Sequence, residues 1–236
     1  MSFIGEGLSY EAKREFRYSF QDYMHDVFRF SSFAGKLVLD LGCGAGIDSA
    51  EFIRNGAQVV SLDFTRTGVK LTQGLLKEAG FPSHVIQADA LSLPFKQNTF
   101  DCVYSFRVLH HIPQIEEALA QIHQVLKPTG QIMVMLYHKD SLLYHSIIYL
   151  RGIKERMLGK FTPDEILSRY SEQRKNCPHT RAYTKSEAKE LFGRFFEDIQ
   201  VEVHYNVIAL PGGRTIKVGL LGKYKLGWHL IVKGTK

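Results

Sequence analysis

Carboxylates and glycines gather where a short apolar stretch of the sequence ends. Asp40 lies inside the stretch and is followed by Gly42, Cys43 and Gly44. Glycines at such a point allow a tight turn with positive φ and let a ligand touch the backbone. A carboxylate just before them can reach the ammonium group of a ligand directly or through water. The arrangement predicts a ligand-binding turn that leads from a strand into a helix.

Two further acids follow the next two apolar stretches. Asp63 ends the second apolar stretch, 21 residues after Gly42. An acid that accepts hydrogen bonds from ribose hydroxyls is expected at this spacing. Asp89, followed by Ala90, ends the third, where a carboxylate can accept a hydrogen bond from an adenine amino group. Because the carboxyl ends of parallel strands meet at one edge of a sheet, we expect these acids to converge there.

The elements that must position these residues alternate between strands and helices from Lys36 onward. Helices are predicted at Ile47–Asn55, Val69–Ala79 and Ile115–Leu126, and a further helix runs from Thr184 to Phe195. Repeated strand–helix–strand units of this length indicate a parallel sheet with helices on both faces. No helix is evident between the last two strands, which are therefore predicted to be antiparallel neighbours. The predicted strands are Leu37–Leu41, Gln58–Asp63, His84–Asp89, Phe100–Ser105, Gln131–Tyr137, Asp198–Tyr205 and Trp228–Lys233.

The 236 residues are long enough for one sizeable core and predict a single domain, 1–236. Its predicted parts are a helical segment (1–35), a ligand-binding core (36–137), a helical insertion (138–183) and a last helix with a strand pair (184–236). The insertion includes an apolar helix at Ser141–Leu158 that turns basic toward its end. We expect the insertion to form a lid over the sheet. Alternatives are a helix that lines an apolar substrate pocket and an interfacial membrane helix.

Composition and charge narrow the class of protein. Hydrophobic residues make up 44% and charged residues 23%, as in ordinary globular proteins, and no apolar run approaches the roughly 20 residues that span a bilayer. The first residues do not resemble a secretory signal, and three distant cysteines predict neither a disulfide framework nor a metal site. We therefore expect a cytoplasmic protein.

The positive charge is concentrated in two segments. Residues 139–185 hold ten Lys or Arg against five Asp or Glu, and residues 214–236 hold six Lys or Arg and no acid. These segments are either solvated surface or surfaces that face an anionic substrate, a membrane or RNA.

The sequence from Val38 to Gly46, VLDLGCGAG, resembles the first motif of the class I S-adenosylmethionine-dependent methyltransferases. Asp63, Asp89–Ala90, Phe106–Ile112 and Leu126–Gly130 resemble the remaining motifs in order. The similarity covers residues 36–137 and the terminal strand pair, and it is closest to small-molecule methyltransferases such as quinone and natural-product enzymes. It implies a Rossmann-like, doubly wound α/β fold whose seven-stranded sheet has an antiparallel edge strand, here with a helical insertion after strand five.

The resemblance implies S-adenosylmethionine as the cofactor, with no metal. Asp40, Gly42 and Gly44 would surround its methionine part, with Cys43 in the same loop. The remaining contacts that the resemblance implies are Asp63 with the ribose, Phe64 beside the adenine, Asp89 with the adenine amino group, Ala90 with the ring edge and Phe106 beside the site.

Two residues after strand four are candidates for contact with the methyl acceptor. His110 lies where a general base is useful, since an unperturbed histidine titrates near pH ~6.5, although His110 and His111 equally suit a helix cap or packing. Arg107 stands where this group often has a small residue, and it is either an acceptor contact or a surface arginine.

The sequence thus predicts a methyltransferase that acts on a small or medium-sized acceptor, with an apolar body and an anionic group. One alternative is an RNA methyltransferase, which the basic segments favour; another is a non-catalytic protein that binds S-adenosylmethionine. Glycines at 42, 44 and 46 depart from the G-x-G-x-x-G of nicotinamide-dependent dehydrogenases. Nothing like an NPPY tetrad or a Pro-Cys pair follows strand four, which argues against DNA-base methylation. The oligomeric state is left open.

Overall fold

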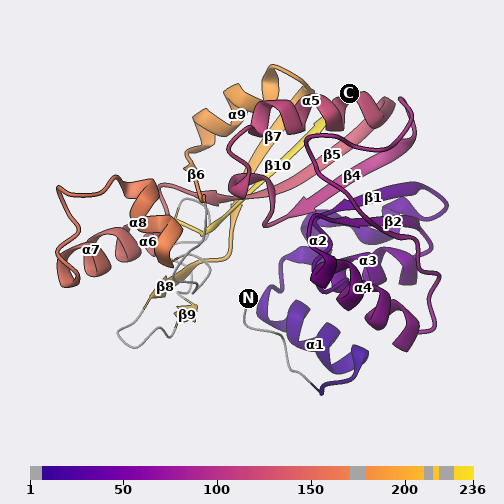
Figure 1. Cartoon of the computed structure of the whole chain (residues 1–236), viewed down its shortest axis with the longest axis horizontal. Helices are drawn as coiled ribbons and strands as arrows, with labels where there is room; N and C mark the ends of the chain where they lie inside the picture. The colour runs from indigo at the N-terminus through magenta and orange to yellow at the C-terminus, as the bar shows by residue number, and fades with distance from the viewer. Residues whose placement is uncertain (1–6, 171–178, 210–214, 218–225) are drawn as a thin grey trace.

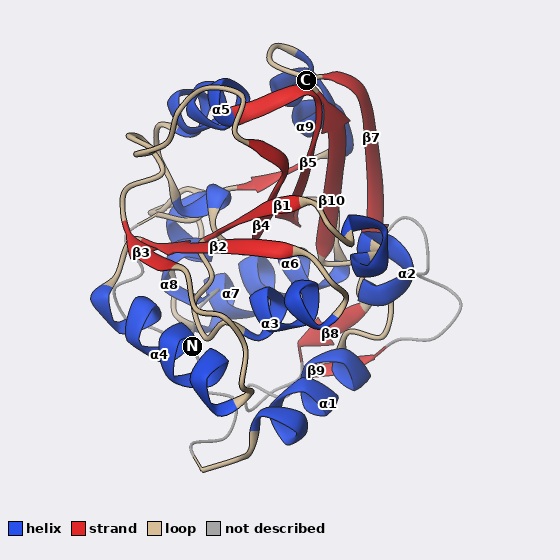
Figure 2. Ribbon diagram, turned by 90° about the vertical axis from the view of Figure 1, so that its right-hand side faces the viewer, coloured by secondary structure: helices blue, strands red, loops and turns tan. Residues whose placement is uncertain are grey.

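The computed structural model describes residues 7–170, 179–209, 215–217 and 226–236, and it has a central sheet between two layers of helices (Figures 1 and 2). The strand order is β3-β2-β1-β4-β5-β10-β7, and the short strand β6 pairs with β5. The strands of this sheet are β1 (Leu37–Leu41), β2 (Gln58–Asp63), β3 (Val85–Gln87), β4 (Phe100–Phe106), β5 (Leu126–His138), β6 (Ala182–Tyr183), β7 (Glu197–His204) and β10 (His229–Thr235). Strands β8 (Val207–Ala209) and β9 (Thr215–Lys217) form a separate antiparallel pair.

Strand directions confirm the predicted doubly wound α/β fold. Strands β1 to β5 are mutually parallel in their pairings, whereas β10 runs antiparallel to both β5 and β7. The predicted antiparallel pairing of the last two strands of this sheet is therefore confirmed. The antiparallel strand β10 is the second strand from one edge of the sheet. It lies between β5 and the edge strand β7.

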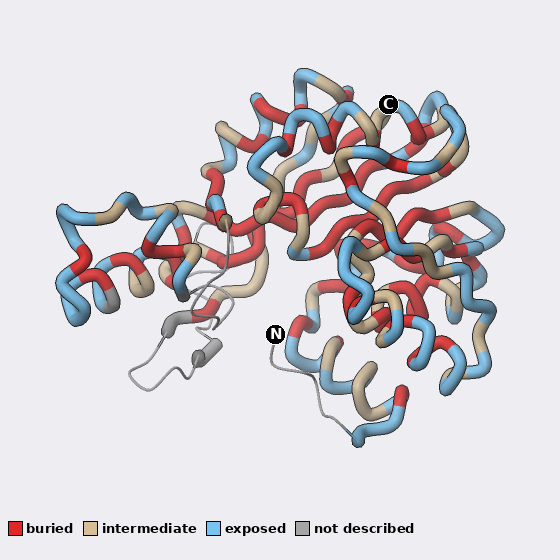
Figure 3. Tube along the Cα trace, viewed as in Figure 1, coloured by how far each residue is buried: buried red, intermediate tan, exposed pale blue. Residues whose placement is uncertain are grey.

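Helices cover both faces of the sheet, and each face has its own core. The first layer holds α1 (Tyr10–Phe20), α2 (Met24–Phe28), η1 (Phe30–Phe33), α3 (Ile47–Arg54) and α4 (Arg66–Glu78). The second layer holds α5 (Ile115–Val125) and α9 (Lys185–Gly193). Buried residues follow one another along the strands between these layers, while the outward turns of the helices are exposed (Figure 3). Burial of these apolar faces is the main source of stability.

The insertion after β5 forms a group of short helices beside the sheet (Figure 1). The predicted helix at 141–158 consists of α6 (Leu142–Ser146), the π-helical segment η3 (Ile147–Arg151) and α7 (Gly152–Lys154), and α8 (Pro163–Tyr170) follows. At the start of α8, Glu165 accepts hydrogen bonds from the backbone and hydroxyl of Thr162. Residues 171–178 of the predicted insertion lie outside the described residues.

Several strand boundaries differ from the sequence prediction, and two of these differences are explained by contacts outside the strand itself. Strand β5 begins at Leu126 rather than Gln131, and the end of β10 lies beside it: Thr235 pairs with Gln131, and the Lys236 amide donates to the Gly130 carbonyl at 2.9 Å. Strand β3 ends at Gln87, so Asp89 lies in the following loop, where its carboxylate accepts from the Leu91 amide at 2.9 Å. Such Asx turns compete with strand pairing.

Candidate active site

The glycine loop leaves the carboxyl end of β1 and is fastened to β2. The amides of Gly42 and Cys43 both donate to the Leu62 carbonyl, at 2.7 and 3.0 Å. Gly42 has φ +83°, and a Cβ at this position would lie 2.1 Å from a methyl carbon of Val108, which follows β4. Any side chain at Gly42 would therefore collide with the neighbouring loop, as expected where backbone must pass close to another segment.

Asp63 at the end of β2 is held against this loop. Its Oδ2 accepts from the Gly44 amide at 2.9 Å, and its Oδ1 accepts from the amide and hydroxyl of Thr65, at 2.8 and 2.7 Å. A carboxylate offers about four acceptor positions, so these bonds leave capacity for a ligand hydroxyl. The structure thus brings the predicted ribose-binding acid to the predicted loop.

Asp40 lies beneath the loop rather than on its open side. Only 2% of its surface is exposed, and its Oδ2 accepts a hydrogen bond from Ser49, whose hydroxyl also accepts from Ser61 at 2.8 Å. Burial raises the pKa of Asp40 to about 7. A cationic ligand group above the loop would favour the ionised form of this carboxylate.

The remaining predicted cofactor residues surround the same sheet edge. Phe64, directly after Asp63, is 68% exposed, which is unusual for a large apolar ring and suits a flat ligand laid against it. Asp89 is exposed and Ala90 buried in the loop after β3. Burial raises the pKa of the Cys43 thiol well above its usual range, so Cys43 is not a thiolate nucleophile.

The N-terminal helix α1 is attached to the helix that follows the glycine loop. Arg17 donates to both carboxylate oxygens of Asp48 at 3.1 and 2.6 Å, and Arg14 forms a second ion pair with Glu51. The guanidinium of Arg17 lies 4.4 Å from the centre of the Phe106 ring. Arg17 and Asp48 are not among the residues predicted from the sequence. The signal that could have found them is their spacing: Arg14 and Arg17 are three residues apart in α1, and Asp48 and Glu51 are three residues apart in α3.

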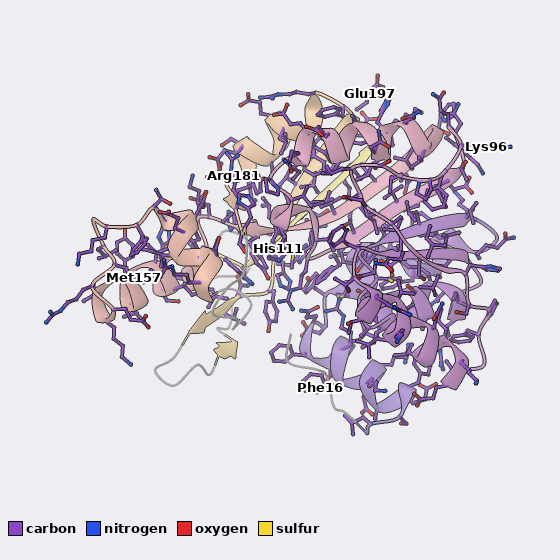
Figure 4. All side chains as sticks on the ribbon, viewed as in Figure 1. Phe16, Lys96, His111, Met157, Arg181 and Glu197 are labelled. Atoms are coloured by element: carbon purple, nitrogen blue, oxygen red, sulfur yellow. The ribbon has the colours of Figure 1, made fainter. Side chains whose placement is uncertain are left out.

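The two histidines after β4 pack beneath the insertion. The His110 ring is fully buried, with its centre 3.9 Å from that of Tyr137, and His111 Nδ1 lies 2.9 Å from the His179 carbonyl. Figure 4 labels His111 and Arg181, which belong to two segments that meet here, since the Arg181 amide donates to the His110 carbonyl at 3.0 Å. A catalytic role for His110 stays a prediction, and it would require the acceptor to enter this packed region.

Arg107 comes directly after Phe106 and is exposed. It has φ +64°, which is uncommon for a residue with a side chain, and its Nε donates to the Tyr137 hydroxyl at 3.3 Å. Among the described residues, no group of three or more His, Cys, Asp or Glu is placed to hold a metal ion. The described helices also include none that is long and apolar enough to cross a membrane.

Comparison with known proteins agrees with this geometry. A family model described as a methyltransferase domain matches residues 39–134. A ubiquinone/menaquinone biosynthesis C-methyltransferase of Blochmanniella pennsylvanica is 39% identical over 114 residues, covering 46% of this chain and 45% of that protein. A demethylmenaquinone methyltransferase of Thermobifida fusca is 35% identical over 107 residues, covering 44% of each.

Solved structures show the same fold over nearly the whole chain. The YcgJ protein of Bacillus subtilis has a TM-score of 0.63 at 17% identity, covering 91% of this chain and 98% of that one. An S-adenosylmethionine-dependent methyltransferase from Aquifex aeolicus has a TM-score of 0.58 at 17% identity, covering 93% and 92%. At this identity the likeness concerns the fold alone.

Residues 39–134 thus match a methyltransferase-domain family, and the fold and the glycine loop with Asp63 resemble those of class I S-adenosylmethionine-dependent methyltransferases. S-Adenosylmethionine is the cofactor of the class. The matches to the ubiquinone/menaquinone biosynthesis C-methyltransferase and the demethylmenaquinone methyltransferase each span less than half of this chain and less than half the length of those relatives.

Proposed function

We propose that this chain transfers the methyl group of S-adenosylmethionine to a small, quinone-like ring acceptor. The observation that carries the proposal is the Asp63 carboxylate, which hydrogen-bonds the Gly44 amide and retains acceptor capacity for a ribose. The names of the relatives support the acceptor class, because one refers to ubiquinone/menaquinone biosynthesis and the other to demethylmenaquinone.

The residues that would hold the cofactor lie at the ends of three strands, and they would contact different parts of the cofactor. Asp40, Gly42 and Gly44 would surround the methionine part, and Asp63 would bind the ribose. Phe64, Asp89 and Ala90 would surround the adenine. The cofactor supplies a methyl group on an already activated sulfonium, so the protein's task is to align the acceptor and exclude water.

The acceptor's charge is a further part of the proposal. Arg107 at the end of β4 and the exposed cations Lys154, Arg156 and Lys160 of the insertion would select an acceptor that joins an apolar body to an anionic group. The insertion would act as a lid that keeps the acceptor in a water-poor pocket.

A thermal-shift experiment tests the cofactor first. S-Adenosylmethionine or its demethylated product, S-adenosylhomocysteine, should raise the midpoint of unfolding, because only the folded state binds it. A shift with NAD and none with either compound at saturation would overturn the proposal. Cofactor binding without turnover of any quinol acceptor would instead indicate a non-catalytic binding protein.

A further inference from the structure

The N-terminal segment meets the last strand through a tyrosine and a histidine that are 206 residues apart. The hydroxyl of Tyr23, just before α2, lies 2.6 Å from Nδ1 of His229, the first residue of β10. His229 is 2% exposed, whereas Tyr23 is only partly buried. A short polar contact thus lies at the boundary between the core and solvent.

Strand register places this pair at the edge of the sheet that carries the cofactor residues. His229 pairs with Tyr137 at the end of β5 and with His204 at the end of β7, and register-paired residues share one face of a sheet. The His229 ring centre is 5.4 Å from that of Phe106, which ends β4. Val108, two residues later, packs against Gly42 of the glycine loop. The side chain of Phe106 therefore connects the Tyr23–His229 pair to the segment after β4 that contacts the glycine loop.

Flat aromatic contacts surround the pair. Tyr23 stacks on His204 with ring centres 4.8 Å apart and planes 13° apart, and Tyr205 stacks on His229 at 4.5 Å and 18°. On the β5 side, Tyr137 and Trp228 stack at 4.2 Å and 21°. We call Tyr23, Phe106, Tyr137, Tyr205 and Trp228, together with His204 and His229, the aromatic wall. Tyr23, His204 and Tyr205 are the partly exposed members of the wall, and their ring surfaces suit contact with a planar ligand.

The proton in the Tyr23–His229 contact has one favoured position. Burial, together with nearby Arg107 and Arg17, lowers the pKa of His229 well below its usual range, so the imidazole is neutral. Burial raises the pKa of Tyr23 well above its usual range, so the hydroxyl keeps its proton. Tyr23 therefore donates to Nδ1, and its oxygen is left with lone pairs that accept a hydrogen bond from another donor.

We propose that Tyr23 is the polar anchor of the methyl-acceptor subsite, accepting a hydrogen bond from a hydroxyl of a planar hydroquinone or phenol held against the aromatic wall. His229 is a positioning residue, because its Nδ1 accepts the hydrogen bond from the Tyr23 hydroxyl and thereby fixes which side of the oxygen faces the ligand. The inference rests on the methyltransferase function proposed above and deepens it. It assigns the residues that recognise the methyl acceptor, and it requires the acceptor to carry a hydroxyl that donates a hydrogen bond.

Binding measurements test the assignment without turnover. The probes are S-adenosylhomocysteine, followed by calorimetry, and 1,4-naphthohydroquinone under reducing conditions, followed by fluorescence of Trp228, the one tryptophan of the chain. Tyr23→Phe should weaken naphthohydroquinone binding by about three- to tenfold, as loss of one hydrogen bond implies, and should leave S-adenosylhomocysteine binding unchanged. His229→Gln should weaken it to a similar extent, and the double variant should be no worse than Tyr23→Phe alone.

Two controls separate hydrogen bonding from packing. 1,4-Dimethoxynaphthalene lacks the hydroxyl donor and should bind the parent and Tyr23→Phe equally. Tyr10→Phe removes a hydroxyl from the same N-terminal segment, where the ring packs on Phe81, and should change neither affinity. Equal losses for both naphthalene probes, or no loss with Tyr23→Phe, would overturn the assignment. A parent chain that binds S-adenosylhomocysteine but not naphthohydroquinone would also overturn it, whereas failure to bind S-adenosylhomocysteine would refute the proposed function instead.

Discussion

Two glycines in helix α4 should respond in opposite ways to the same substitution. A Cβ added at Gly68 would lie 2.4 Å from Cγ of Asp63 and 2.5 and 2.6 Å from its oxygens, whereas one added at Gly74 would meet nothing within 4 Å. Both positions are helical, so alanine should favour the helix at each by about 0.8–1.0 kcal/mol. At Gly68 this gain is opposed by a collision with the carboxylate that we assign to the cofactor ribose.

The size of each effect follows from these distances. Gly74→Ala should raise the free energy of unfolding by about 1 kcal/mol, which raises the melting midpoint by roughly 2–4 °C in a chain of this size. Gly68→Ala must push the Asp63 carboxyl carbon about 1 Å away to reach ordinary van der Waals contact. That shift disrupts the hydrogen bond from the Gly44 amide and misplaces the ribose acceptor. Hydrogen bonds to charged groups contribute about 1.5–3 kcal/mol, so affinity for the cofactor should fall about ten- to hundredfold.

Differential scanning fluorimetry and calorimetric titration with S-adenosylhomocysteine measure both quantities on the parent and the two variants. Gly74→Ala serves as the matched control, because it makes the same change in the same helix away from Asp63. If Gly68→Ala gains stability as Gly74→Ala does and still binds S-adenosylhomocysteine with the parent affinity, our placement of Asp63 at the ribose is wrong.

Asp63→Ala should lower the affinity for S-adenosylhomocysteine by about tenfold or more, since it removes the charged ribose acceptor; unchanged affinity of a folded variant in calorimetry would contradict this. Replacing residues 141–178 with a short linker should abolish methyl transfer and leave S-adenosylhomocysteine binding nearly intact; a folded variant that still methylates its acceptor at the parent rate would refute the lid proposal. Burial raises the pKa of Asp40 from 3.8 to about 7. Between these values the folded chain holds a proton that the unfolded chain has lost, so this residue's contribution makes stability fall as pH rises. The stability advantage of Asp40→Asn over the parent should therefore grow from about pH 4 to about pH 7 and then level, by up to a few kcal/mol. A difference that stays constant across urea denaturations in this range would show that Asp40 does not titrate as argued.

The sequence by itself determined the features that depend on residues close together in the chain. The glycine loop and its entry into α3 follow from Gly42, Gly44 and Gly46, whose φ values are all positive. The capping box that joins Thr184 to Glu187 at the start of a predicted helix also involves residues three apart, and the structure has both of its hydrogen bonds. Local rules succeed here because the interacting groups are held near each other by covalent connection, whatever the rest of the chain does.

Strand ends were predicted less well where a distant segment completes the pairing. The Lys127–Gly130 stretch suits a turn by its composition, yet it continues β5. The reason is that the chain's last residues lie alongside and supply hydrogen-bond partners. Periodicity reports which face of an element is buried, but it does not report which segment will lie beside it.

Only the tertiary structure decided how the acceptor side is built. The order β5-β10-β7 brings His229 beside the end of β5, and the N-terminal segment then brings Tyr23 within 2.6 Å of it. The same packing joins Arg17 to Asp48 and encloses His110, the residue that the sequence favoured as a base. No local pattern contains these contacts, because each depends on the order of the strands and on which helix covers which face. The cofactor loop is a short-range structure, whereas the acceptor side is assembled from segments at opposite ends of the chain.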